Sequence, residues 1–185
     1  MKMCLLLSVL LALTLGAGLS LVPTPVAAQR HDPLTHQETD ALRDAAQMPD
    51  ARTKLFLGFA GARLEAAEKL HTDPTLQQPQ ALTELQRLLY DFADIIDELD
   101  DNLDAFDDRG TDLRAALRAV IETESDFQQR LRKMRETLSP AVLQEVNGEL
   151  EDAIESVDDG AKSSRAMLDE QSNDRVEEKA GKKSR

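Results

Sequence analysis

The chain of 185 residues has little cysteine and few aromatics: one Cys, one Tyr and no Trp. The only cysteine, Cys4, lies in a segment that we expect to be removed, which leaves the mature chain without a thiol. That excludes disulfides, thiolate metal ligands, cysteine nucleophiles and c-type haem attachment. Alternating runs of Val, Ile and Thr are missing as well, which argues against a β-sheet.

Basic residues are outnumbered by acidic ones, and the formal net charge is −13. An acidic surface repels phosphate backbones and anionic lipid headgroups. Nucleic acid is therefore not an expected partner, and neither is an anionic membrane surface. The partner that we expect is a protein, whose identity the sequence does not specify.

Residues 1–28 have the features of a signal peptide. Lys2 precedes an almost wholly apolar run from Cys4 to Val22, and Val26-Ala27-Ala28 fits the small-x-small cleavage rule, with the cut before Gln29. We therefore predict export to the periplasm or the extracellular space, with no membrane span after cleavage. The alternative is a retained anchor, because the apolar run approaches the length that spans a bilayer.

Apolar residues that recur every three or four positions predict an all-α protein. Residues 29–48 are expected to hold a leader and a short helix, which begins at a capping box from Thr35 to Glu38. Further helices are predicted over 49–71, 80–108, 111–138 and 140–168, with Gly110 as a left-handed stop. Residues 169–185 have a basic, polar composition that predicts a disordered tail.

The short connections between these helices require antiparallel neighbours. The predicted fold of residues 49–168 is therefore an elongated up-down antiparallel four-helix bundle. The alternative is a longer helical hairpin that dimerises to complete its core, which would make the protein a homo-oligomer.

The helix over 80–108 has the most regular apolar pattern. Its heptad positions are Leu82, Leu85, Leu89, Phe92, Ile96, Leu99, Leu103 and Phe106, and Leu88 and Ile95 widen the face. For the helix over 49–71, the core face is predicted to comprise Leu55, Phe59, Ala62, Ala66 and Leu70, broadened by Phe56 and Leu57.

The same helix carries nine acidic residues and no basic residue between Asp91 and Asp108. Spacings of three and four align several of them in a ridge opposite the apolar face. The simplest interpretation is a solvated surface. The alternative is a weak Ca²⁺ or Mg²⁺ surface, because hard cations prefer carboxylate oxygens. Its ligands would be Asp94, Asp97, Asp101 and Asp104.

Glu124 interrupts the apolar face of the helix over 111–138, between Val120 and Phe127. A buried carboxylate must be paired or protonated. We expect either an ion pair with a neighbouring arginine, such as Arg63 or Arg130, or access of water to this point of the face. The alternative is a polar core group that sets helix register or binds a ligand.

No combination of residues suggests catalysis. The three histidines are His31, His36 and His71, and no nucleophile–base pair or glycine-rich phosphate loop accompanies them. The Glu-x-x-His spacing of ferritin-like di-iron sites occurs once, at Glu68 to His71, where two copies are needed. We therefore predict no enzymatic activity and no cofactor.

Leu82-Thr83-Glu84-Leu85-Gln86 resembles the LTxxQ signature of small helical periplasmic stress chaperones, and Leu34 to Glu38 is a near match. The resemblance implies a helical protein that holds unfolded clients in the envelope. From the residues themselves, we predict a non-enzymatic exported bundle that acts as an interaction or structural module. Cation binding by the ridge and client holding are the alternatives.

Overall fold

The computed structural model describes residues 31–183, with side chains described as far as Asn173. The predicted signal peptide lies outside this range. Within it, the secondary structure is entirely helical, in agreement with the predicted all-α class. The elements are α1 (His36–Asp44), α2 (Pro49–His71), α3 (Pro79–Asp107), α4 (Arg114–Thr137) and α5 (Pro140–Lys183). None of the helices in this range is long and apolar enough to cross a membrane.

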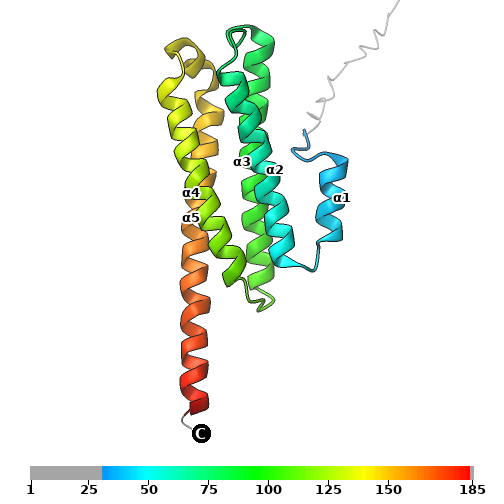
Figure 1. The fold of residues 1–185 in the computed structure, drawn as a ribbon, viewed down its shortest axis with the longest axis vertical. Helices are drawn as coiled ribbons and strands as arrows, with labels where there is room; N and C mark the ends of the chain where they lie inside the picture. Colours follow the sequence, from blue (N-terminus) through cyan, green and yellow to red (C-terminus); the bar gives the residue numbers. More distant parts are fainter. Residues whose placement is uncertain (1–30, 184–185) are drawn as a thin grey trace, which may run out of the picture. The chain divides into compact units, whose positions relative to one another are not determined.

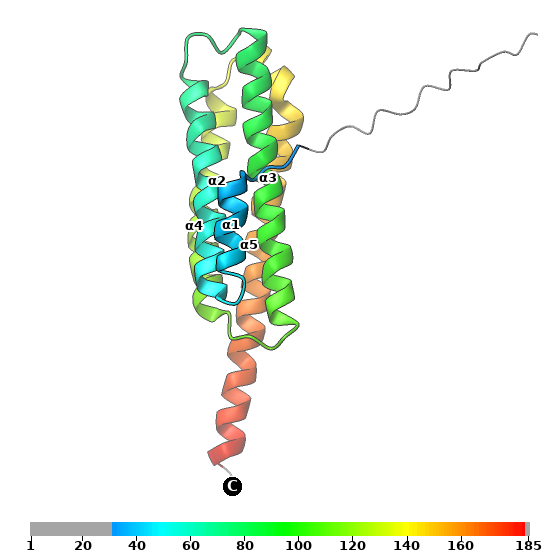
Figure 2. The same cartoon turned by 90° about the vertical axis from the view of Figure 1, so that its right-hand side faces the viewer.

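Each of the four long helices packs against two of the other three. α2 contacts α3 and α4, and α5 contacts the same two helices, which closes a ring around one core. The chain passes up and down through this ring, as Figures 1 and 2 show. α1 lies against α2 alone. These contacts agree with the predicted four-helix bundle.

Local sequence signals explain where the helices begin and end. In the capping box, Glu38 N donates to Thr35 Oγ1 at 3.2 Å and Thr35 N donates to a Glu38 carboxylate oxygen at 2.8 Å. α2, α3 and α5 each begin with a proline, whose missing N–H is not needed in the first turn. Gly110 has a φ of 69°, which confirms the predicted left-handed stop.

The core follows the apolar pattern closely on α3 and α4. On α3, the heptad positions from Leu85 to Phe106 are buried and Leu82 is partly buried. On α4 and at its two ends, residues that recur every three or four positions are all buried: Leu113, Leu117, Val120, Glu124, Phe127, Leu131, Met134 and Leu138. Phe92 and Phe127 meet edge to face across the core, with ring centroids 5.3 Å apart. Burying a side chain of this size contributes roughly 1.5–3 kcal/mol.

The predicted core face of α2 is only partly confirmed: Phe56 and Leu57 are buried, but the centre of the face is misplaced. The buried positions are Thr53, Phe56, Leu57, Ala60, Leu64 and Ala67. Ala62 is exposed, and Leu55, Phe59, Ala66 and Leu70 are only partly buried at the margin of the core. α2 has two apolar faces because it also packs against α1, and periodicity alone does not tell which face meets α3 and α4.

The predicted end of the last helix at Leu168 is wrong, since α5 continues to Lys183 where we predicted a disordered tail. Gln171 anchors the first part of this extension: its side chain accepts from Leu113 N at 2.9 Å and donates to Asp107 and to Thr111 O. Further along, α5 extends past the ends of the other helices (Figure 1).

Candidate functional site

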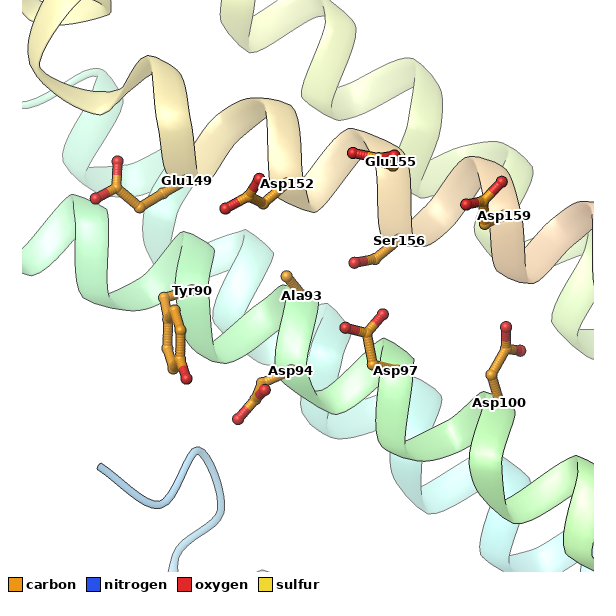
Figure 3. Close-up of a pocket in the computed structure, with 10 residues that line it drawn as sticks. All are labelled: Tyr90, Ala93, Asp94, Asp97, Asp100, Glu149, Asp152, Glu155, Ser156 and Asp159. Atoms are coloured by element: carbon orange, nitrogen blue, oxygen red, sulfur yellow. The ribbon is translucent and has the colours of Figure 1, made fainter. Parts of the chain in front are cut away.

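An acidic groove runs between α3 and α5 and has a volume of about 380 Å³. Figure 3 shows Asp97 and Asp100 on α3 pointing toward α5, with Ser156 of α5 pointing back. No basic side chain of the described residues lines the groove. Its lining is seven carboxylates together with Tyr90, Ala93 and Ser156; the carboxylates are Asp94, Asp97, Asp100, Glu149, Asp152, Glu155 and Asp159.

The structure divides the predicted acidic ridge between two surfaces. Asp94 and Asp97 line the groove, whereas Asp101 and Asp104 are exposed on α3 outside it. Asp91, one of the nine acids, is not on the surface at all: it is 1% exposed and lies against His31 and Arg87. Among the described residues, no group of three or more His, Cys, Asp or Glu side chains is arranged to hold a metal ion.

Glu124 is fully buried in the core of the bundle, with 0% of its surface exposed. The expected ion pair with Arg63 or Arg130 is wrong. Arg63 instead holds Glu38 at 2.6 Å, and Arg130 holds Glu68 at 2.7 Å. Within the part of the chain that has described side chains, neither carboxylate oxygen of Glu124 has a hydrogen-bond partner. Both arginines lie nearer the surface, where their guanidinium groups keep partial contact with water.

Glu124 lies close to Asp100 and Gly160. A Cβ atom on Gly160 would lie 2.9 Å from Glu124 Oε1 and 3.3 Å from both carboxylate oxygens of Asp100. The two carboxylates, from α4 and α3, therefore converge on the same side of this α5 residue. A side chain at position 160 would force the Glu124 carboxylate to shift, because the added Cβ would come within 3.0 Å of it.

Burial and mutual repulsion disfavour the ionised form of both carboxyl groups. Burial, and then the charge of Asp100, raise the pKa of Glu124 to about 9, against the opposing effect of Arg165. Burial and the surrounding aspartates raise the pKa of Asp100 to about 6. At neutral pH, Glu124 therefore carries a proton, while Asp100 is mostly ionised.

Two features of this region were missed by sequence reasoning. The α5 carboxylates that line the groove, from Glu149 to Asp159, recur every three or four residues, a signal that was present in the sequence. The approach of Asp100 to Gly160 left no such signal, because it depends on how α3 and α5 pack. Ser164, one turn beyond Gly160, adds a second buried side chain whose hydroxyl has no partner among the described residues.

Comparison with known proteins gives no further guide, because this chain matches no protein-family model, no curated protein and no solved structure.

Proposed function

We propose that this protein is a non-enzymatic interaction module of the cell envelope that binds a basic segment of a partner protein in the α3–α5 groove. The observation that carries the proposal is the lining of the groove, which among the described residues includes seven carboxylates and no basic side chain. Such a surface attracts lysine and arginine side chains and repels acidic partners. Export to the envelope rests on the composition of residues 1–28.

Tyr90 strengthens the case for a cationic partner. It lines the groove and is half exposed, and with Met48 it is one of two large hydrophobic residues that are exposed in the described range. An aromatic face beside carboxylates favours a lysine or arginine side chain, because the cation interacts with the ring and with the acids together.

The test is the binding of a labelled lysine- and arginine-rich peptide, measured by fluorescence anisotropy over a series of salt concentrations. In the groove variant, Asp97, Asp152 and Asp159 are replaced by Asn. In the matched control, Glu122, Glu136 and Glu145, which are exposed and lie outside the groove, are replaced by Gln. Both variants lose the same number of negative charges, so any effect of net charge alone is the same in the two.

We expect the groove variant to bind roughly tenfold more weakly, because each exposed charge contributes up to about 1 kcal/mol. The control variant should bind like the wild type, and added salt should weaken the wild-type complex. Equal weakening of both variants would show that net charge, and not the groove, attracts the peptide.

Divalent-cation binding is the second candidate, since Asp94 and Asp97 line the groove beside Asp100. It lacks a preformed cluster of three ligands in the described part of the chain. Thermal melts with Ca²⁺ or Mg²⁺, against NaCl at matched ionic strength, distinguish a site from screening. A site at a hundred times its dissociation constant adds about 2.7 kcal/mol.

Client holding, which the LTxxQ resemblance implies, has less support. Holding unfolded chains needs exposed apolar surface, and the described surface exposes few large apolar side chains. The motif itself lies within α3, so Thr83 does not cap the start of a helix. Its Gln86 is engaged with α5, where Nε2 donates to Glu145 O at 2.7 Å. Failure to suppress the aggregation of an unfolding test protein at stoichiometric amounts would exclude this function.

A further inference from the structure

Behind the Asp100 side of the acidic groove lies a buried carboxyl group, that of Glu124, which has no hydrogen-bond partner among the described residues. Asp100 lines the groove, and its oxygens converge with Glu124 Oε1 on the same side of Gly160. Glu124 does not line the groove itself; it is buried behind Asp100, and its Oε1 and the Asp100 oxygens face the same point in front of Gly160. Its burial without a hydrogen bond is costly unless a proton or a cation accompanies it.

We propose that the Asp100–Glu124 pair binds the ammonium group of a lysine side chain from the partner segment. This inference rests on the proposed function of the groove. It adds one specific anchoring position to a surface that is otherwise attractive to any basic segment.

Lysine fits this position better than arginine. Its ammonium group is compact, carries three donors and sits at the end of a slender four-carbon stem. Gly160 carries no side chain that would cover the Asp100 and Glu124 carboxylates on the α5 side, and the space beside them is narrow. The broad, planar guanidinium group of arginine requires more space. Arg165, the cation that acts on Glu124 within the chain, is itself exposed on α5.

Binding at this position exchanges a proton for the ammonium group. Glu124 is protonated in the free protein; when the ammonium group arrives, the carboxylate forms and the proton leaves to solvent. The charged groups that act on Glu124 are Asp100 of α3 and Arg165 of α5. The buried residues of α2 include no titratable group. Affinity should therefore rise with pH between about 6 and 9, where Asp100 is ionised and lysine is still charged.

The experiment is isothermal titration of the full chain at about pH 7.5 in two buffers of different ionisation enthalpy, which measures the protons released. The ligands are a lysine-containing basic peptide, the same peptide with arginine at every lysine, and free spermidine. The variant is Glu124→Gln, which keeps size and removes the charge. The control is Glu122→Gln, which changes an exposed residue of the same helix. Helicity and melting by circular dichroism show that both variants fold.

We expect the lysine peptide to release about one proton on binding to the wild type. Glu124→Gln should abolish this release and weaken binding roughly 10- to 100-fold, as expected for a lost charge-assisted hydrogen bond. Glu122→Gln should change neither, and the arginine peptide should bind without proton release.

Equal affinity and equal proton release in Glu124→Gln would overturn the lysine position while leaving the groove as a basic-segment site. Proton release with spermidine but not with the lysine peptide would show that the Asp100–Glu124 pair binds a free polyamine and not a lysine of a partner protein. If no basic peptide binds the wild type, both this inference and the proposed function fall.

Discussion

Replacing Gly160 with alanine places a methyl group where two carboxyl groups converge. The added Cβ would lie 2.9 Å from Glu124 Oε1 and 3.3 Å from both oxygens of Asp100. Gly148 provides a matched control on the same helix, because a Cβ there meets no atom within 4 Å. Both glycines are helical, so both substitutions have the same effect on helix propensity.

The expected magnitudes follow from two opposing effects. Alanine is more favourable than glycine in a helix by about 1 kcal/mol. Overpacking a buried site costs about 1–3 kcal/mol, because the fully buried Glu124 carboxylate must shift away from the added methyl group. Gly148→Ala should therefore stabilise the protein by about 1 kcal/mol. Gly160→Ala should be about 1–3 kcal/mol less stable than Gly148→Ala.

Thermal melts followed by circular dichroism measure this difference. For a domain of this size, 1 kcal/mol shifts the melting temperature by about 2–4 °C. Gly160→Ala should therefore melt roughly 2–12 °C below Gly148→Ala. In a background with Glu124→Ala, the added methyl group has room, and Gly160→Ala should become stabilising.

Two results would refute this reasoning. If Gly160→Ala raises the melting temperature as much as Gly148→Ala does, the carboxylates are not held against Gly160. If the loss in Gly160→Ala persists when Glu124 is replaced by Ala, the collision involves something other than that side chain.

Three further predictions concern other parts of the described chain. Because the pKa of Glu124 is raised to about 9 in the folded state, its stabilising contribution is complete below the unfolded pKa near 4.5 and is lost as pH rises through 9. Urea unfolding should show the free energy of unfolding fall from pH 6 to 8 by up to about 1.4 kcal/mol per pH unit because of this group. Glu124→Gln should make this pH dependence shallower; equal slopes in wild type and variant would contradict a raised pKa of Glu124. Arg63→Ala removes hydrogen bonds to Glu38 at 2.6 and 2.9 Å and to Pro33 O at 2.9 Å, and should destabilise the protein by roughly 1–3 kcal/mol. Limited proteolysis should then cut α1 earlier than in the wild type. Arg43→Ala, on the exposed side of α1, should have neither effect. Truncation after Asn173 should leave the melting temperature nearly unchanged, because α5 there extends past the other helices (Figure 1); a large drop would show that this extension packs against the bundle.

The helices themselves follow from short-range information. Prolines in the first turn, the capping box at Thr35 and the left-handed Gly110 act through neighbouring backbone groups, so their effect is visible in the sequence. The apolar faces of α3 and α4 were equally readable, since each has a single broad face. On α2 the pattern was ambiguous, because α1 covers a second apolar face.

Some features of the candidate site likewise follow from the sequence of one helix, and others depend on how the helices pack. The sequence by itself determined that α3 carries a long acidic face and that Glu124 lies in the core, because both are properties of one helix. Only the tertiary structure decided that the α3 acids meet those of α5 in a groove, and that Asp100 and Glu124 converge on Gly160. These juxtapositions depend on the register in which three helices pack. That register is set by the fit of many core side chains at once, and no residue in the chain encodes it alone.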